Sequence, residues 1–292
     1  MGLTQTIPVV IYIITEFREC LVRSFRQLCL ACTSGDGVLA NLKMKEVKGV
    51  MGQLDIQFKG SLMQDASEFF SKFIIELNEE LSNVPTNMDV AKRMVDIYQT
   101  PSDNLVKINF LHEREEFHVC SNCNAESSAR HSDMAIWCET VSHTVNTRTR
   151  STSLQLLLEQ NFAKEKRERR CEECGCETAA TTIRLVKLPR VIVIYLKRYN
   201  YNHQDLARSK KVRSVIDIPE TVNLTSLVTE TVNLPRAPVS MVARDKVWDD
   251  GSRPPELSYQ LASVVSHQGE GTRSGHYVAD VFRLELLLWQ CV

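Results

Sequence analysis

Apolar residues recur every three or four positions in two stretches of the N-terminal third of the chain, a spacing typical of amphipathic helices. In residues 16–32 the repeating positions are Phe17, Leu21, Phe25, Leu28 and Cys32. Residues 34–37 end this stretch, because Ser-Gly-Asp-Gly is a turn sequence. The first predicted helix therefore covers residues 16–32.

A second helix is predicted over residues 61–81. Ser61 is the expected N-cap, and Asp65 lies near the positive end of the helix dipole. The buried stripe of this helix is expected to be Phe69, Phe73, Ile74 and Leu77.

The pattern changes to alternation after residue 104, which predicts strands. Residues 105–110 alternate as a half-buried strand does, and residues 190–199 form a nearly continuous β-branched run after Pro189. The second run predicts a central strand buried on both faces. Residues 200–256 are expected to be loops and edge strands, and regular strands return at 259–265 and 277–282. Helices first and strands later favour an α+β fold.

Composition narrows the function classes. The chain has 292 residues, 43% hydrophobic and 24% charged, with a formal net charge of -1, so no basic surface is expected for nucleic acid or anionic lipid. The apolar segment 7–14 is too short to span a bilayer, which takes about 20 residues, and it lacks the flanks of a signal peptide. We therefore expect no membrane partner. The ten cysteines should lie in a reducing, intracellular compartment.

Two Cys-x-x-Cys pairs are the strongest metal signal. Cys120 and Cys123 form the first pair and Cys171 and Cys174 the second, with residues 124–170 between them. Each pair can place two thiolates on one tetrahedral Zn²⁺, and two pairs close a structural four-sulfur site. The long separation suggests two β-hairpins that meet in space. Cys176 could replace one ligand, and a redox pair or buried, unliganded cysteines are the alternatives.

His276 is the strongest catalytic signal. It lies in Ser-Gly-His-Tyr at residues 274–277, beside an apolar strand, with a glycine before it that permits close approach. A histidine presented in this way suits the general base of a thiol hydrolase. That chemistry also requires a cysteine and a group that orients the imidazole.

Several of these segments resemble motifs of the ubiquitin-specific proteases. Residues 64–70 read Gln-Asp-Ala-Ser-Glu-Phe-Phe, similar to the family's Gln-Asp-Ala-x-Glu-Phe helix start, and the cysteine pairs resemble its zinc fingers. Residues 188–199 resemble its Leu-Pro-x-Val-Leu-x-x-x-Leu-Lys-Arg-Phe strand, and residues 259–269 and 274–277 its histidine box. The resemblance covers roughly residues 20–289. It is closest to the subgroup with a long insertion in the catalytic domain, although most of that insertion is missing here.

The resemblance implies a papain-like domain of thumb, palm and fingers that hydrolyses the isopeptide bond after the C-terminal glycine of ubiquitin. It implies a helical thumb over residues 16–100 and a β-rich palm with zinc fingers over 105–292, after a divergent start at 1–15. His276 is then the general base, and His267 a neighbour without a catalytic role. The zinc held by Cys120, Cys123, Cys171 and Cys174 is structural.

The resemblance also places Asp65 and Glu68 near the channel for the ubiquitin tail. The alternatives are a helix-terminus charge for Asp65 and a solvated helix face for Glu68. Ubiquitin and ubiquitinated proteins are the expected partners, in the cytoplasm, the nucleus or both.

Two family motifs have no counterpart in the sequence. The family opens with Gly-Asn-Thr-Cys, which supplies the nucleophile, and an Asn or Asp that orients the histidine follows the tryptophan matched by Trp289. We therefore expect a domain incomplete at both ends, with little or no activity in the chain as it stands. The alternatives are a catalytically inactive ubiquitin-binding protein and a truncated product of a longer gene.

Overall fold

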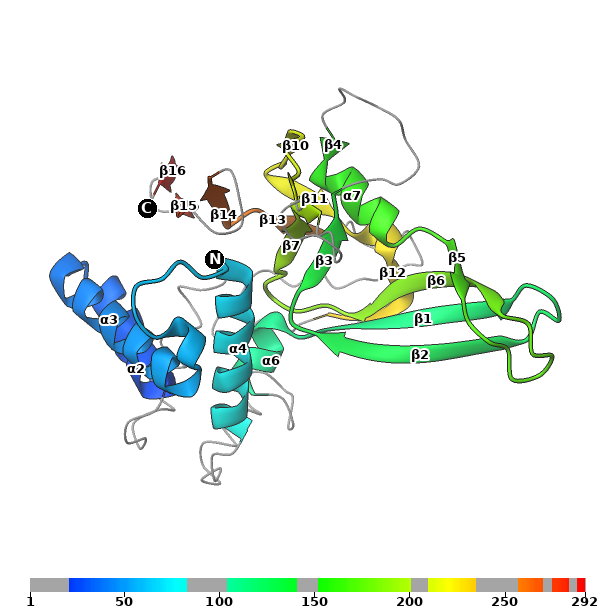
Figure 1. Ribbon diagram of the computed structural model, residues 1–292, viewed down its shortest axis with the longest axis horizontal. Helices are drawn as coiled ribbons and strands as arrows, with labels where there is room; N and C mark the ends of the chain where they lie inside the picture. The colour runs from blue at the N-terminus through cyan, green and yellow to red at the C-terminus, as the bar shows by residue number, and fades with distance from the viewer. Residues whose placement is uncertain are drawn as a thin grey trace, which may run out of the picture. The chain divides into compact units, whose positions relative to one another are not determined.

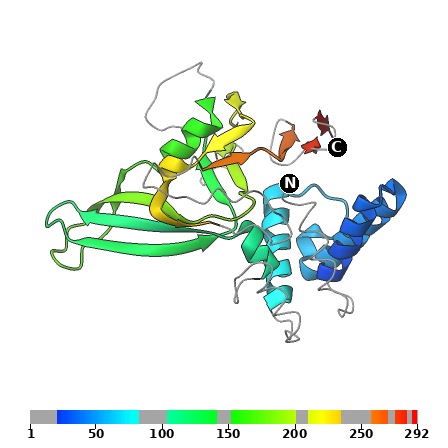
Figure 2. The same cartoon turned by 180° about the vertical axis from the view of Figure 1, so that it is seen from behind.

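The computed structural model describes residues 21–82, 104–140, 152–200, 210–234, 257–269, 275–283 and 288–291. The described residues form two compact units, one helical and ending at Phe110, the other β-rich and beginning at Leu111 (Figures 1 and 2). Helix and sheet are thus segregated along the chain, which confirms the predicted α+β class. No helix in the described part of the chain is long and apolar enough to cross a membrane.

In its described residues the helical unit contains five elements: α2 (Leu21–Thr33), α3 (Gly37–Leu54), the 3-10 turn η1 (Ile56–Phe58), α4 (Ala66–Ser82) and α6 (Leu105–Phe110). Leu21, Met51, Phe73 and Leu77 are buried between these helices. The start of α2 is held by Glu80, whose carboxylate accepts from the backbone N–H groups of Leu21 and Val22 at 3.0 and 2.9 Å. A carboxylate at this end satisfies N–H groups that the helix itself leaves unpaired.

The first two predicted helices are present with different starts. Within α4, Phe73, Ile74 and Leu77 are buried as expected and Phe69 is half-buried. The predicted N-cap Ser61 is wrong, because α4 begins only at Ala66. In α2, Leu21 and Leu28 are buried, while residues 16–20 lie outside the described part.

Helix α3 was not predicted from the sequence. Asp36 caps it, since its side chain accepts from the N–H of Leu39 at 2.9 Å. Only Val47, Met51 and Gly52 of its eighteen residues are buried, so the apolar stripe that reveals a helix is short.

The strand predicted at residues 105–110 is wrong, because these residues form helix α6. Asn104 starts the helix by accepting from the N–H of Lys107 at 3.0 Å, and its amide also donates to the backbone oxygen of Asn78 in α4. Leu105 and Ile108 are buried on the same side, as residues three apart in a helix are. Six residues are too few to distinguish the two-residue repeat of a strand from the 3.6-residue repeat of a helix. Packing against α4 therefore decides in favour of the helix.

The β-rich unit is built around one long sheet, here called the knuckle sheet because both cysteine pairs lie at its tip. It consists of β1 (His112–Cys120), β2 (Glu126–Asp133), β5 (Glu165–Glu168), β6 (Thr178–Lys187) and β12 (Val228–Asn233). The order is β12-β6-β1-β2, with β5 also paired to β6. The β1–β2 and β5–β6 hairpins are antiparallel and joined by the antiparallel β1–β6 ladder, as Figure 1 shows. The two predicted hairpins that meet in space are confirmed.

Short strands, one α-helix and a 3-10 turn make up the rest of this unit within the described ranges. They are β3 (Ile136–Glu139), β4 (Thr152–Ser153), α7 (Leu154–Asn161), β7 (Ile194–Lys197), β8 (Tyr199–Asn200), β9 (Lys210–Lys211), β10 (Ile216–Asp217), β11 (Thr221–Asn223), the 3-10 turn η3 (Thr225–Leu227), β13 (Ser258–Gln260), β14 (Ser263–Gln268), β15 (His276–Arg283) and β16 (Leu288–Cys291). Cys138, Leu158, Leu185, Leu188 and Leu224 are among the residues of its apolar core.

The central strand predicted at residues 190–199 is wrong in extent and burial. Only Ile194–Lys197 forms β7, which among the described residues pairs with β3 alone, in parallel. Its side chains are half-buried or exposed: Ile194 and Leu196 pack against the core, and the Tyr195 ring lies tilted at 57° to the ring of the exposed Trp137, with centroids 4.4 Å apart. Full burial is found instead just before the run, at Leu188 and Pro189.

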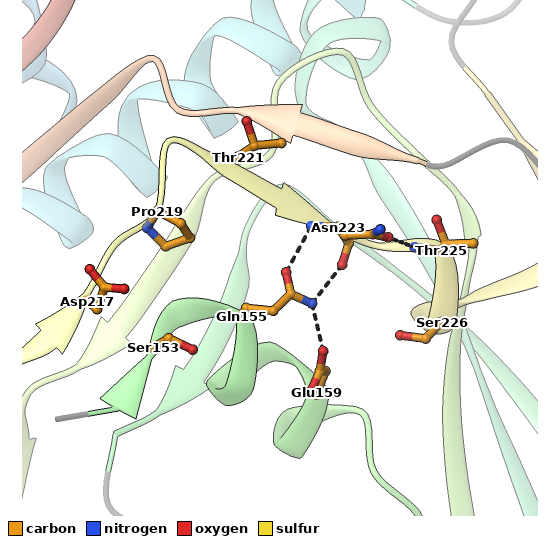
Figure 3. A pocket seen from close by; sticks show the side chains of 9 residues that line it. All are labelled: Ser153, Gln155, Glu159, Asp217, Pro219, Thr221, Asn223, Thr225 and Ser226. Atoms are coloured by element: carbon orange, nitrogen blue, oxygen red, sulfur yellow. Dashed lines mark hydrogen bonds between the residues drawn. The ribbon is translucent and has the colours of Figure 1, made fainter. Parts of the chain in front are cut away.

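A hollow of about 830 Å³ lies between α7 and the β10–β11–η3 segment and is lined by hydroxyl, amide and carboxylate side chains. Gln155 reaches across it from α7 (Figure 3). Its amide donates to the backbone oxygen of Asn223 at 2.9 Å and accepts from the N–H of Asn223 at 2.9 Å. The side chain thereby pairs the edge of β11 as a neighbouring strand would.

Candidate metal centre and histidine strand

The two cysteine pairs occupy equivalent turns at the tip of the knuckle sheet. In the first turn, Asn124 adopts a φ of 59° and donates its N–H to the oxygen of Cys120 at 3.2 Å. In the second, Gly175 adopts a φ of 72° and donates to the oxygen of Cys171 at 2.9 Å. Asn and Gly tolerate this left-handed conformation better than other residues. Both turns therefore fold back in the same way and aim their thiols at a common point.

The four sulfur atoms lie at distances that suit one zinc ion. The Sγ atoms of Cys120, Cys123, Cys171 and Cys174 are all within 4.8 Å of one another. The contacts Cys120–Cys174 and Cys123–Cys171 are each 3.6 Å. A tetrahedron with Zn–S bonds of about 2.3 Å has sulfur–sulfur edges of roughly 3.8 Å. These residues fit a tetrahedral metal with all four positions taken by sulfur.

The pKa values of two of these thiols are shifted in opposite directions. The backbone N–H of Cys176, with help from Asn122 and the neighbouring thiols, lowers the pKa of Cys174 to about 6. At Cys123 the N–H of Ala125 favours the thiolate, but the neighbouring thiols outweigh it and raise the pKa to about 12. Four clustered thiols resist ionising together, and a divalent cation that draws the thiolates together would displace the remaining protons.

Cys176, the alternative ligand that the sequence allows, lies outside the group of four. Its Sγ is 3.7 Å from the backbone oxygen of Thr178. Both turns belong to antiparallel hairpins, unlike the βαβ setting in which a redox Cys-x-x-Cys pair occurs.

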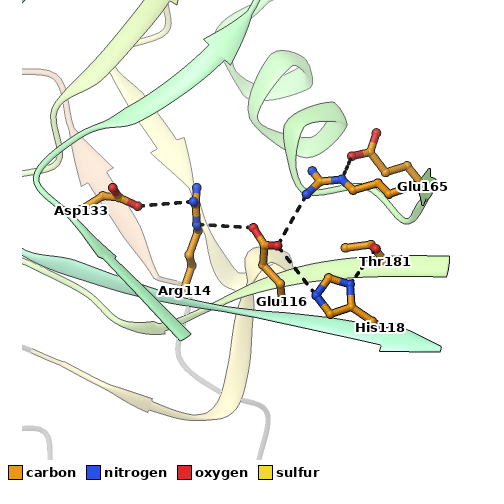
Figure 4. Close-up of polar contacts among 7 residues, drawn as sticks. Arg114, Glu116, His118, Asp133, Glu165 and Thr181 are labelled. Carbon is orange, nitrogen blue, oxygen red and sulfur yellow. Dashed lines mark hydrogen bonds and ion pairs between the residues drawn. The ribbon is translucent and has the colours of Figure 1, made fainter. Parts of the chain in front are cut away.

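A row of charged side chains on the knuckle sheet was not predicted from the sequence. Arg114, Glu116 and His118 alternate along β1 and so share a face. The Glu116 carboxylate lies 3.8 Å from Arg114, 3.6 Å from Arg167 and 3.9 Å from His118 (Figure 4). His118 also contacts the Thr181 hydroxyl at 2.9 Å, and burial lowers its pKa. This row ties β1 to β5 and β6 beside the metal site.

His276 is the first residue of β15 and is exposed. It stands opposite Gln268, the last residue of β14, at the end of an antiparallel ladder. β16 pairs with the other side of β15 and brings Trp289 opposite Phe282. The two predicted strands on either side of the histidine box are therefore present, with a break at residues 261–262. The structure presents His276 at a strand terminus, as the sequence indicated.

The backbone just before His276 is packed against a second histidine. Gly275 has a φ of +154°, and a Cβ added there would lie 2.3 Å from Nε2 of His267 and 2.4 Å from the oxygen of Gln268. The His267 ring also contacts the Tyr277 ring in a tilted arrangement, with centroids 4.9 Å apart and 53° between the ring planes. Glycine is therefore required at position 275, which supports the interpretation that it permits close approach.

Two residues that hold His267 were missed at the sequence level. Tyr199 of β8 places its hydroxyl 2.8 Å from Nδ1 of His267. Lys211 of β9 donates from Nζ to the backbone oxygen of His267 at 2.6 Å and to that of Gly269 at 3.1 Å. Tyr199 ends the 188–199 motif, but the motif does not indicate this contact, and Lys211 carries no sequence signal, because only the β8–β9 pairing brings the two residues beside β14.

Asp65 and Glu68 lie at the start of α4 in the helical unit. The Asp65 carboxylate accepts from the N–H groups of Ser67 and Glu68, at 2.7 and 3.2 Å, and from the Ser67 hydroxyl. Asp65 thus caps α4 in place of the predicted Ser61, and Glu68 is exposed in its first turn. The structure accounts for Asp65 as a helix cap, and the tail-channel role stays a prediction.

Comparison with known proteins identifies the family. Residues 11–289 match the family model described as ubiquitin carboxyl-terminal hydrolase. Ubiquitin carboxyl-terminal hydrolase 37 of Gallus gallus is 27% identical over 88% of this chain, and the human protein of that name is 26% identical over 76%. Human ubiquitin carboxyl-terminal hydrolase 29 is 24% identical over 65%. These matches cover only 26%, 22% and 21% of the relatives' own lengths, so the chain spans about a quarter of them or less.

Solved structures share the fold. A SAGA DUB module of Ubp8, Sgf11, Sus1 and Sgf73 bound to monoubiquitin matches with a TM-score of 0.65 and 16% identity, over 94% of this chain and 55% of that one. The Ubp8/Sgf11/Sus1/Sgf73 module bound to ubiquitin aldehyde matches with a TM-score of 0.66 and 17% identity, over 99% and 59%. The family model, which spans nearly the whole sequence, shows that this chain belongs to the ubiquitin carboxyl-terminal hydrolase family.

Proposed function

We propose that this chain is the ubiquitin-binding body of a thiol-dependent deubiquitinase, with His276 as its general base. The observation that carries the proposal is the presentation of His276, exposed at the end of the β14–β15 ladder and preceded by a glycine that no other residue could replace without displacing His267. The reaction would be hydrolysis of the isopeptide bond after the C-terminal glycine of ubiquitin. Two solved neighbours of the same fold are complexes with ubiquitin or ubiquitin aldehyde.

In this chemistry the imidazole takes the proton of a cysteine thiol, and the thiolate attacks the carbonyl carbon. The same imidazole then protonates the leaving amine, and water hydrolyses the thioester that remains. An exposed imidazole at the start of a strand paired with β14 suits this role, because substrate can reach it.

We assign zinc to Cys120, Cys123, Cys171 and Cys174, with a structural role. All four sulfurs would be ligands, so no position is left open for substrate. The metal would fix the two hairpin turns at the tip of the knuckle sheet. In this assignment the β-rich unit supplies palm and fingers and the helical unit the thumb.

Asp65 and Glu68 are proposed to border the channel for the ubiquitin tail, in a supporting role. Glu68 is exposed and its carboxylate can meet a bound chain, whereas Asp65 acts by holding the start of α4. The variant Asp65→Asn retains the cap and should retain ubiquitin binding. Asp65→Ala should lose about 0.5–2 kcal/mol of stability.

A second candidate function is ubiquitin binding without cleavage, and the cysteines favour it. Burial raises the pKa of Cys29 to about 11 and that of Cys138 to about 12, so neither is a ready nucleophile. Cys32 is exposed in the last turn of α2, not at a helix N-terminus, the position that activates a catalytic thiol. Of the other cysteines in the described residues, the four proposed zinc ligands and Cys176 lie in the metal-site turns, and Cys291 is the last residue of β16.

One experiment separates the two functions. The zinc-loaded chain and its His276→Gln variant would be mixed with a ubiquitin–rhodamine substrate, and ubiquitin binding would be measured by calorimetry. Turnover that His276→Gln abolishes, with binding intact, supports the enzyme. Binding without turnover in both proteins supports the second function, and absence of binding in the folded protein refutes both.

A further inference from the structure

The ladder that presents His276 ends at that residue. Gln268 pairs with His276, and the hairpin continues beyond this pair into Gly269 and Gly275, whose φ values are 157° and 154°. Pairs at the end of a ladder open more readily than those inside it. A catalytic side chain at such a position needs a brace from outside the hairpin.

Lys211 supplies a brace of this kind. Its Nζ donates to the backbone oxygens of His267 and Gly269, at 2.6 and 3.1 Å, and lies 3.3 Å from Nδ1 of His267. The two carbonyls flank Gln268, the residue opposite His276. A lysine ammonium offers three donors, so one side chain can hold both carbonyls and the ring together. The brace thus bears directly on the pair that presents the imidazole.

A second line of contact runs through the His267 ring. Tyr199 holds Nδ1 at 2.8 Å, and Nε2 and Cε1 lie against Gly275, where an added Cβ would be 2.3 and 2.7 Å away. The ring therefore fills the space between β8–β9 and the backbone that enters His276. Movement of His267 would be transmitted to that backbone, because no gap separates them.

We propose that Lys211 is a positioning residue for His276. It clamps the end of β14 and, through the His267 ring, fixes the backbone from which the His276 side chain projects. This inference rests on the proposed role of His276 as general base. Lys211 itself takes no part in proton transfer in this account, because its ammonium is engaged by two carbonyls and the His267 ring.

Hydrogen exchange of the zinc-loaded chain, read by mass spectrometry, tests the proposal without requiring activity. Lys211→Met keeps the aliphatic stem and removes the donors, whereas Lys211→Arg keeps donors. Lys166→Met, at an exposed lysine of β5 in the same unit, controls for loss of charge. We expect Lys211→Met to raise exchange in β14 and β15 about tenfold and to leave β1 and β6 unchanged. Lys211→Arg should restore protection, and Lys166→Met should have no effect.

Two outcomes overturn the proposal: unchanged exchange in β14 and β15 of Lys211→Met, or an equal rise in β1 and β6, which would indicate general destabilisation.

The NMR signal of the His276 Cε1–H, assigned by its loss in His276→Gln, provides a second test. Its chemical shift should change in Lys211→Met and return to the wild-type value in Lys211→Arg. Where the chain turns over ubiquitin–rhodamine, Lys211→Met should lower kcat about tenfold with KM unchanged. Failure of the proposed function would appear instead as wild-type protein without turnover or ubiquitin binding but with the exchange pattern intact.

Discussion

Replacement of Gly275 by alanine tests the close packing at the histidine strand. The added methyl group would lie 2.3 Å from Nε2 of His267 and 2.4 Å from the oxygen of Gln268. Neither atom can yield easily, because the ring is held by Tyr199 and the carbonyl belongs to the adjacent strand. The substitution should therefore displace β15 from β14 rather than fit into the hairpin.

The expected loss of folding stability in Gly275→Ala has two parts. A residue with a Cβ at a φ of +154° bears backbone strain of about 1–3 kcal/mol. Forcing an extra methyl into a filled space adds about 1–3 kcal/mol. Part of the overlap relaxes because His276, the next residue, is exposed. We expect a net loss of about 2–4 kcal/mol in the free energy of unfolding.

Urea unfolding, followed by circular dichroism and by tryptophan fluorescence, measures this loss. Gly175→Asn is the matched control: Gly175 has a φ of +72° with nothing within 4 Å, and Asn124 holds the equivalent position of the other turn. Its cost should stay below about 0.5 kcal/mol. A loss below about 1 kcal/mol in Gly275→Ala, or equal losses in both variants, would refute the packing argument.

Three further predictions concern other parts of the molecule. Metal analysis of gel-filtered protein should find about one zinc per chain, lost in Cys174→Ser and retained in Cys176→Ser; zinc in neither or both variants would contradict the assignment. Gln155→Leu should lower stability in thermal unfolding by about 2 kcal/mol, because two backbone groups of β11 lose their partner, whereas exposed Gln160→Leu should cost less than about 0.5 kcal/mol. Burial lowers the pKa of His112 from 6.5 to about 4. As the pH falls, the His112 imidazole is therefore protonated in the unfolded chain at a higher pH than in the folded chain. The stability that depends on neutral His112 is complete above pH 6.5 and should fall by about 2 kcal/mol by pH 5. Urea midpoints of wild type and His112→Gln at pH 7.5 and 5 isolate this term, and parallel losses would contradict it.

The sequence predicts elements whose pattern is local. Phe73, Ile74 and Leu77 recur at helical spacing and are buried in α4. The cysteine pairs predict a four-sulfur cluster from spacing alone, because two residues between cysteines is the length of a tight turn. The role of Gly275 before His276 can be predicted for a similar reason. A glycine directly before a histidine at the start of a strand lets the backbone pack closely where a side chain would not fit.

The wrong or missing predictions have a common physical cause. Where the local sequence pattern fits more than one structure, tertiary contacts decide which structure forms. Residues 105–110 satisfy both strand and helix periods, and Asn104 with α4 selects the helix. The apolar run after Pro189 has strong β propensity, but β3 is only four residues long and pairs only as far as Lys197. Lys211 and Tyr199 could not be predicted, because their role exists only once β8 and β9 lie beside β14.

The ladder between β1 and β6 has a consequence for how this domain can change during evolution. It sets Cys120 opposite Ala179. The distance between the two cysteine turns is therefore fixed by this ladder and does not depend on the length of the chain between them. The entropy of closing a loop grows slowly with its length, about 0.6 kcal/mol for each doubling. Sequence inserted between the two cysteine pairs can therefore cost little closure entropy, and it would leave the sulfur cluster undisturbed as long as the β1–β6 ladder is kept.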